Sequence, residues 1–173
     1  MTEEKRWISS EALFSAVKEL LAEHRQAVFT VTGMSMWPFL CHGRDQVVVE
    51  YCDPETIKKG DIILFQTLLG KYLLHRVVRL DGRQFETAGD GNCFRDGWFD
   101  RSCVCARVTK LIRNGKTIDC GSLRWKAVFR FWMGLFPVRR VLLRILVMVS
   151  TVLRMAEKLW SRERHGKRKD QKQ

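Results

Sequence analysis

Short runs of β-branched and aromatic residues follow one another between residues 27 and 119, with turn residues between them and no helical stretch. The last two runs are joined by Asn114-Gly115, a dipeptide typical of a two-residue β-hairpin turn. Parallel strands need long crossover connections, usually helices, so this pattern disfavours a nucleotide-binding α/β sheet. It predicts a mainly β domain of antiparallel strands, in a barrel or a sandwich. The expected strands are Ala27–Thr32, Gln46–Tyr51, Asp61–Gln66, Tyr72–Leu80, Gln84–Thr87, Cys103–Ile112 and Lys116–Asp119.

Helices are expected on both sides of this β-domain. Residues 9–26 carry apolar side chains at helical spacing, and Ser9 or Ser10 can cap the start of the helix. After Leu123 the chain becomes apolar and arginine-rich, and Pro137 is expected to separate two helices. The predicted organisation is an N-terminal helical segment (1–26), a β-domain (27–123), a basic amphipathic helical appendage (124–160) and a basic tail (161–173).

The charge of the chain is concentrated at its C-terminal end. The net charge is +12 over 173 residues, of which residues 1–123 carry +1 and residues 124–173 carry +11. Because a nearly neutral β-domain lacks the basic surface that binds nucleic acid, no nucleic-acid partner is expected. A nucleic-acid-binding regulator that acts through the basic tail is the least favoured function.

Six cysteines are spread along the chain without a Cys-x-x-Cys pair. We expect buried structural thiols, as in a reducing compartment. Cys103 and Cys105 would share one face of a strand, but further ligands at a useful spacing for a metal site are not found. Neither a metal nor a cofactor is therefore expected.

The appendage has the composition of a helix that lies on a membrane surface. Residues 141–155 are apolar but are interrupted by Arg144 and Arg154, whereas a spanning helix needs about 20 mostly apolar residues. Polar residues at spacings of three and four draw a narrow stripe on a wide apolar surface, which is typical of a basic helix in an anionic interface. We therefore expect peripheral membrane association through residues 124–160, with the β-domain on the cytoplasmic face. Helices that pack on the β-domain, an oligomer interface and a tilted span that exports the domain are the alternatives.

Four polar residues stand where catalytic groups are expected. Ser35 follows a β-like run two residues after Gly33, where a turn can present its hydroxyl and direct backbone amides at an oxyanion. His75 lies in an apolar run and can act as a base near neutral pH. A carboxylate must then orient the imidazole, and Asp90 and Asp96 are the candidates. Each residue alone is more often a turn or core residue, and their joint occurrence favours a Ser-His-Asp site.

These residues belong to four motifs that occur in order. The motifs are Gly-Met-Ser-Met-Trp-Pro (33–38), Lys-Gly-Asp-Ile-Ile-Leu-Phe (59–65), Leu-His-Arg-Val-Val (74–78) and Gly-Asp-Gly-Asn (89–92). Together they resemble the signal peptidase I and SOS-repressor superfamily of serine endopeptidases, over roughly residues 27–120. The resemblance implies a partly open antiparallel barrel that cleaves an extended peptide with small side chains near the cut.

The base motif separates two branches of that superfamily. It holds His75 here, as in the endoplasmic-reticulum type of signal peptidase, whereas the bacterial housekeeping enzymes and the repressors carry lysine. In the histidine branch two aspartates lie six residues apart, and by this resemblance Asp96 is the triad acid and Asp90 supports the site. The physical argument alone leaves the choice between the two open. The implied oxyanion donors are the backbone amides of Met34 and Ser35.

Two functions are expected from this pattern. The first is a serine endopeptidase of the signal peptidase type that cleaves signal or leader peptides. The second is a non-catalytic peptide-binding module of the same fold. An intact nucleophile, base and acid favour the first, because a pure binder needs none of them. Signal peptidases normally carry an N-terminal transmembrane anchor, and we expect the helices of residues 124–160 to take its place.

Overall fold

The computed structural model describes residues 10–170, so Ser9, one of the two expected caps, lies outside the described residues. Helix α1 (Ser10–Ala22) confirms the N-terminal helix but ends before the expected residue 26. The physical reason is His24, whose backbone adopts the left-handed conformation with a φ of 55° and cannot continue the helix.

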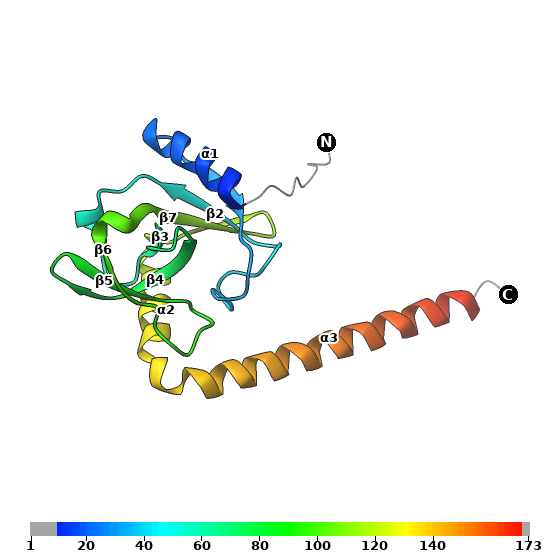
Figure 1. Cartoon of the computed structure of the whole chain (residues 1–173). Helices are drawn as coiled ribbons and strands as arrows, with labels where there is room; N and C mark the ends of the chain where they lie inside the picture. The colour runs from blue at the N-terminus through cyan, green and yellow to red at the C-terminus, as the bar shows by residue number, and fades with distance from the viewer. Residues whose placement is uncertain (1–9, 171–173) are drawn as a thin grey trace. The chain divides into compact units, whose positions relative to one another are not determined.

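Eight strands form one antiparallel sheet (Figure 1). The sheet runs in the order β1-β2-β7-β3-β4-β5-β6, and β8 pairs with β7 beside this path. The first and last strands in this order are edge strands, so the sheet is not closed, and the coarse prediction of a mainly antiparallel β fold is confirmed. The strands are β1 (Ala27–Thr30), β2 (Gln46–Glu50), β3 (Ile62–Gln66), β4 (Tyr72–Asp81), β5 (Gln84–Ala88), β6 (Gly97–Asp100), β7 (Val104–Arg113) and β8 (Lys116–Asp119), with 3₁₀ turns η1 (Pro54–Thr56) and η2 (Arg101–Cys103).

Strand β6 is the one strand that the sequence pattern does not predict. It has four residues and pairs antiparallel with β5, with Asp100 opposite Gln84 at one end and Gly97 opposite Thr87 at the other. A strand this short is defined by its pairing partner more than by its own composition. Its position matters for the site, because Asp96 immediately precedes it and the Asp96 amide donates to the Thr87 carbonyl at 2.9 Å.

Strand β3 is buried on both faces and separates two apolar clusters. Ile62 and Leu64 belong to a cluster that also includes side chains of α1. Ile63 and Phe65 point to the other face, where they pack with Phe85. With a core on each face, this strand pairs with β4 on one side and with β7 on the other.

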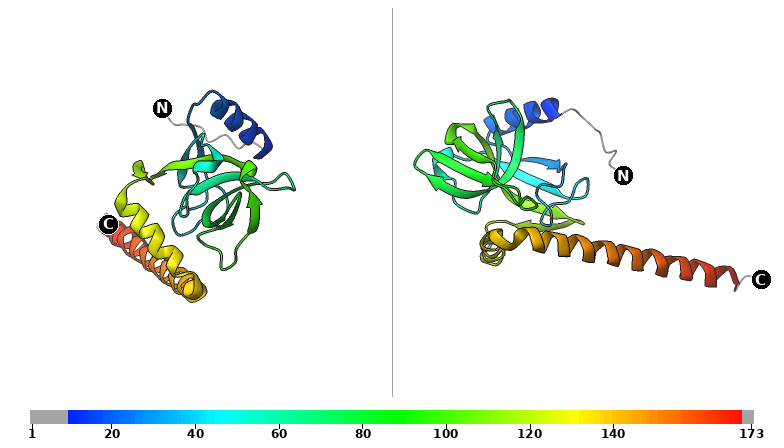
Figure 2. Two further views of the ribbon diagram at one scale, coloured as in Figure 1. Left: turned by 90° about the vertical axis from the view of Figure 1, so that its left-hand side faces the viewer. Right: turned by 60° about the horizontal axis from the view of Figure 1, so that its bottom comes forward.

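Helix α2 (Leu123–Gly134) is part of the β-domain rather than of an appendage. Its side chains Phe129 and Trp132 are 3% and 8% exposed, and Phe129 belongs to the same apolar cluster as α1. The two helices lie at opposite ends of the β-domain (Figure 2). The first compact unit therefore extends to Gly134, past the boundary expected after residue 123, because aromatic side chains of α2 complete its core.

The second unit begins at Leu135 and contains η3 (Phe136–Val138) and α3 (Arg139–Asp170). Pro137 lies in η3, between α2 and α3, where the sequence predicts the break between two helices. Helix α3 is continuous, so residues 161–170 of the expected tail are helical. Among residues 10–170, no helix is long and apolar enough to cross a membrane.

Candidate active site

The imidazole of His75 is paired with the carboxylate of Asp96. His75 Nδ1 lies 2.6 Å from Asp96 Oδ2, and both side chains are more than nine-tenths buried. An ionised carboxylate can only accept a hydrogen bond, so this contact places the proton on Nδ1 and leaves Nε2 able to accept one. Thr87 Oγ1 donates to the same carboxylate oxygen at 2.7 Å, which fixes its position.

Asp90 is bound by a different residue of β4, Arg76, which directly follows His75. Its two carboxylate oxygens accept from Arg76 Nε at 2.8 Å and from Arg76 Nη2 at 2.6 Å. Both side chains are 1% exposed, so this is a fully buried bidentate ion pair. Successive side chains of a strand point to opposite faces, which is why His75 and Arg76 bind different aspartates. The structure therefore pairs Asp96, and not Asp90, with the histidine.

Ser35 lies in a turn that is bonded to the Asp90 segment. The amide of Gly91 donates to the Ser35 carbonyl at 2.7 Å. A Cβ added at Gly91 would lie 2.8 Å from the Met34 carbonyl oxygen and 2.9 Å from that of Trp37. Only glycine allows so close an approach of two backbones, so Gly91 holds the serine turn against the segment that follows β5.

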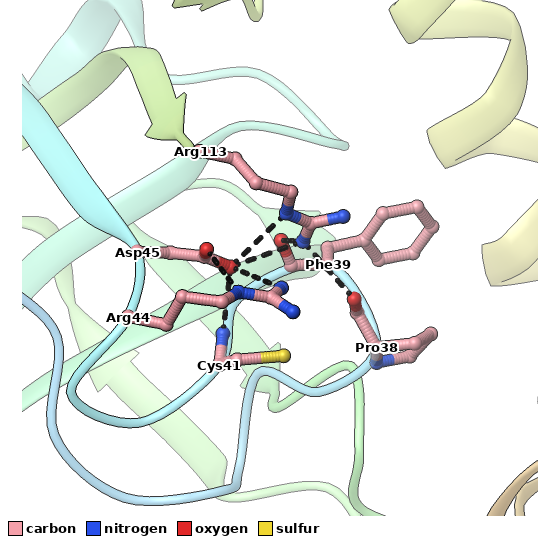
Figure 3. Close-up of polar contacts among 6 residues, drawn as sticks. All are labelled: Pro38, Phe39, Cys41, Arg44, Asp45 and Arg113. Atoms are coloured by element: carbon pink, nitrogen blue, oxygen red, sulfur yellow. Dashed lines mark hydrogen bonds and ion pairs between the residues drawn. The ribbon is translucent and has the colours of Figure 1, made fainter. Parts of the chain in front are cut away.

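The other side of the serine turn is held by a charge cluster around the buried carboxylate of Asp45 (Figure 3). Asp45 is 1% exposed and accepts from the Cys41 amide and from the guanidinium groups of Arg44 and Arg113. Arg113 also donates to the backbone carbonyls of Pro38 and Phe39, two residues of the same turn. This cluster ties β7, through Arg113, to the segment that carries Ser35.

Burial alone would raise the pKa of the Asp45 carboxyl. The hydrogen bonds from Arg44, from the Cys41 amide and from Arg113, together with the positive charge of Arg113, outweigh burial and hold the pKa of Asp45 below its ordinary value. The carboxylate is therefore ionised at neutral pH and serves as a fixed anion for the two arginines.

Ser35 and His75 line the same cleft, which has a volume of about 500 Å³. The two residues therefore border one common space. The cleft is also lined by residues of α1, of β1 and of the start of β4, namely Leu13, Phe14, Phe29, Thr30, Tyr72, Leu73 and Leu74. Its walls combine apolar side chains with the polar groups of Ser35, His75, Lys71, Tyr72, Thr30 and Thr32, and a mixed lining of this kind can hold a peptide segment.

The backbone of the serine turn also offers donors for an oxyanion. Among the described residues, no hydrogen bond is made by the amides of Met34 and Ser35, the two donors that the resemblance implies. Gly33, with a φ of +84°, precedes them, and its own amide donates to His42 Nδ1 at 3.0 Å. The two following amides are thus available to a substrate, in a turn held from two sides.

The cysteines are free thiols, and the described residues contain no group of three or more His, Cys, Asp or Glu side chains that could hold a metal ion. They are less uniformly buried than the sequence suggests, because Cys93 is exposed and only Cys52 is fully buried. Burial raises the pKa of Cys120 to about 12, so this thiol is protonated at neutral pH.

Three contributions to the site are not visible in the sequence pattern. Thr87 is the last residue of a short predicted strand, Arg76 lies inside the histidine motif without an assigned role, and Arg113 is one of many basic residues. Of these three residues, only Arg76 gives a signal in the sequence, because it is a charged residue inside an otherwise apolar β-run. If such a charge is buried, it requires a partner. The partner itself comes from another segment and is found only in the fold.

No protein-family model and no curated protein matches the chain. The function is therefore inferred from the geometry of the site and from the motifs of the sequence.

Proposed function

We propose that this protein is a serine endopeptidase of the signal peptidase type, with Ser35 as nucleophile, His75 as base and Asp96 as the acid that orients His75. The observation that carries the proposal is the contact between His75 Nδ1 and Asp96 Oδ2, in a cleft that is also lined by Ser35. Three residues far apart in the sequence supply the parts of one mechanism. Asp90 supports the site through Arg76 and is not the triad acid.

The proposed reaction follows from the roles of these groups. Ser35 Oγ attacks the carbonyl carbon of the scissile peptide bond while His75 Nε2 takes its proton. The carboxylate of Asp96 stabilises the imidazolium that forms, and the amides of Met34 and Ser35 donate to the oxyanion. The imidazolium then gives its proton to the leaving amine, and water hydrolyses the acyl-enzyme by the reverse sequence of proton transfers.

An extended substrate can pair with the strand edges beside the cleft. Residues 72–75 of β4 pair with β3 on one side, whereas β5 pairs only from Arg76 onward. Strand β1 pairs with β2 and forms an edge of the sheet. A peptide that adds as a strand would meet backbone donors and acceptors along these edges, with its scissile bond near Ser35. The resemblance adds small side chains near the cut, as in a signal or leader peptide.

The test is cleavage of synthetic signal and leader peptides, with products identified by mass spectrometry. The wild-type protein is expected to cut at a defined bond, and Ser35→Ala and His75→Ala are each expected to abolish the cut while the circular dichroism spectrum stays unchanged. Ser15→Ala, on the α1 helix, is the matched control and should keep full activity. Full activity of either site variant would refute the assignment. Saturable binding without any cleavage by the wild type would instead indicate the non-catalytic peptide-binding module.

We also infer that the second unit attaches the protein to an anionic membrane surface. In α3 the apolar side chains of Val141, Ile145 and Val152 are about half exposed, and they lie on one face of the helix. Arg140 and Arg144 lie on its polar stripe, where they can contact lipid phosphates while the apolar face enters the interface. The attachment is peripheral in this proposal and keeps the peptidase on the cytoplasmic face.

Flotation with anionic vesicles separates this interpretation from simple charge attraction. The double variant Ile145→Asp, Val152→Asp should lose flotation, because it places two carboxylates on the apolar face. The control Val147→Asp, Thr151→Asp makes the same change of charge on the polar stripe and should still float with the vesicles. Equal flotation of both double variants would contradict insertion of the apolar face.

A further inference from the structure

Two aromatic side chains of α2 contact the groups that support the proposed active site. The indole Nε1–H of Trp132 donates to the backbone carbonyl of Asp90 at 3.1 Å, in a buried environment. The ring of Phe129 lies 4.0 Å from the guanidinium carbon of Arg76, at cation–π distance. Each aromatic residue therefore contacts one partner of the buried Arg76–Asp90 ion pair.

The Arg76 side chain is 1% exposed, and its guanidinium is surrounded by a carboxylate, a backbone carbonyl and two aromatic rings. Asp90 binds it through two hydrogen bonds, and the Gly60 carbonyl accepts from Arg76 Nη1 at 2.8 Å. The ring of Phe39 lies 5.7 Å away, and that of Phe129 covers the guanidinium plane. Because Arg76 follows His75 directly in β4, this enclosure fixes the backbone that carries the imidazole.

The same aromatic residues reach the serine turn. Phe39 makes edge-to-face contacts with Phe129 at 5.2 Å and with Trp132 at 5.6 Å between ring centroids. Phe39 belongs to the turn of Ser35, and its carbonyl is bound by Arg113. Helix α2 thus touches the serine turn, the residue next to the histidine, and the Asp90 segment that is bonded to Ser35.

We propose that Trp132 is a positioning residue that sets the distance between the serine turn and the histidine strand, through its hydrogen bond to Asp90. The proposal rests on the proposed peptidase function and adds to it a contribution from α2, outside the four motifs. The bonds form a chain from the Trp132 indole to the Asp90 carbonyl, and from the next amide, that of Gly91, to the Ser35 carbonyl. A ring without the N–H would keep the packing on Phe39 but would leave the Asp90 carbonyl without this donor.

The direct test is Trp132→Phe in the full-length protein, compared with Phe131→Leu. Phe131 is the neighbouring α2 residue and is 69% exposed, so its replacement changes an aromatic side chain without touching the site. Trp132→Phe is expected to lower kcat about tenfold with little change in KM, as the loss of one buried hydrogen bond in the transition-state geometry implies. Phe131→Leu is expected to keep the wild-type kcat.

Two further measurements separate positioning from simple loss of stability. All rates are measured well below the melting temperature of each variant, determined beforehand. The rate at which a fluorophosphonate probe labels Ser35 is expected to fall for Trp132→Phe by the same factor as kcat. A wild-type kcat and labelling rate for the folded Trp132→Phe variant would overturn the proposal, and so would equal losses in both variants.

If the wild-type protein cleaves no peptide, the peptidase proposal fails while the positioning role of Trp132 is still tested by NMR. The amide resonances of Ser35 and Gly91 are expected to shift in Trp132→Phe and to stay in place in Phe131→Leu. Unchanged Ser35 and Gly91 resonances in Trp132→Phe would overturn the positioning role independently of any activity.

Discussion

The backbone amide of Gly91 donates a hydrogen bond of 2.7 Å to the carbonyl oxygen of Ser35. The two residues are 56 positions apart in the sequence, and they join the turn of the proposed nucleophile to the segment after β5. Asp90, the residue before Gly91, binds Arg76, and Arg76 follows His75 in β4. The relative position of nucleophile and base is therefore set by contacts outside the reacting groups.

The first prediction concerns Gly91→Ala. The added methyl group would lie within 3 Å of the Met34 and Trp37 carbonyl oxygens, so the serine turn must move away. We expect a loss of about 1–3 kcal/mol in the free energy of unfolding, typical of overpacking, together with a lower kcat. Urea unfolding and peptide cleavage measure the two effects. Gly134→Ala, which meets no atom within 4 Å, is the control, and equal effects of both variants would contradict the close approach.

The second prediction concerns Asp96→Asn. An amide of the same shape can present its N–H₂ to His75 Nδ1 and favour the wrong tautomer, in which Nε2 carries the proton and cannot act as a base. We expect kcat to fall by about three to four orders of magnitude with little change in stability. Steady-state cleavage and thermal unfolding test this. A variant with more than about a tenth of the wild-type kcat would exclude Asp96 as the triad acid.

The third prediction concerns Asp90→Asn, which should affect stability more than kcat, whereas Asp96→Asn should affect kcat more than stability. Removal of this carboxylate leaves the buried Arg76 cation without its counterion, a change that costs about 3–5 kcal/mol in comparable buried pairs. We expect a large loss of the free energy of unfolding, and a smaller loss of kcat than for Asp96→Asn when the protein is folded. Urea titration of both variants gives the comparison. If Asp96→Asn were instead the less stable variant and Asp90→Asn the less active one, Asp90 would be the triad acid and the present assignment of Asp96 would be wrong.

The fourth prediction concerns the pH dependence of stability at Asp45. Its pKa lies below the ordinary value of 3.8 in the folded protein, so its charge stabilises the fold above that value, and this contribution is lost as the pH falls through the lowered pKa. Asp45→Asn should reduce the free energy of unfolding by about 1–3 kcal/mol at pH 7, the range for hydrogen bonds to a charged group, because both arginine partners are partly exposed to solvent. The difference from the wild type should shrink progressively below about pH 4.

Denaturant unfolding across this pH range measures that difference. Asp81→Asn, at the exposed end of β4, removes a solvent-accessible carboxylate and should leave the free energy of unfolding close to that of the wild type. A constant difference between Asp45→Asn and the wild type from pH 7 to pH 3 would show that the Asp45 charge is not the source of the stability.

Local pattern was sufficient for most of the secondary structure. Alternating apolar residues and turn dipeptides predict the positions of seven strands, and Pro137 marks the interruption between α2 and α3. These signals are local, because strand pleat and turn geometry depend on residues close together in the chain. The end of α1 and the strand β6 were not predicted, since a left-handed residue and a pairing partner decide them.

The place of α2 could not be read from composition. Its segment is as basic and apolar as the helix that follows, and the sequence therefore groups both in one appendage. In the fold, Phe129 and Trp132 are buried against the Arg76–Asp90 pair, whereas apolar side chains of α3 are exposed. Burial is a property of the surroundings and not of the residue, so two similar helices have different roles.

The sequence by itself determined the chemical groups of the proposed site and the antiparallel β character of the domain that carries them. Only the tertiary structure decided which aspartate meets the histidine. Asp90 and Asp96 carry the same side chain and are only six residues apart, so the physical argument from the sequence leaves the choice between them open. The pairing of β6 with β5 brings Asp96 to His75 and Thr87, while the turn after β5 leaves Asp90 to Arg76 on the opposite face of β4. Hydrogen bonds select partners by position in space, and that position is fixed only when the whole sheet has formed.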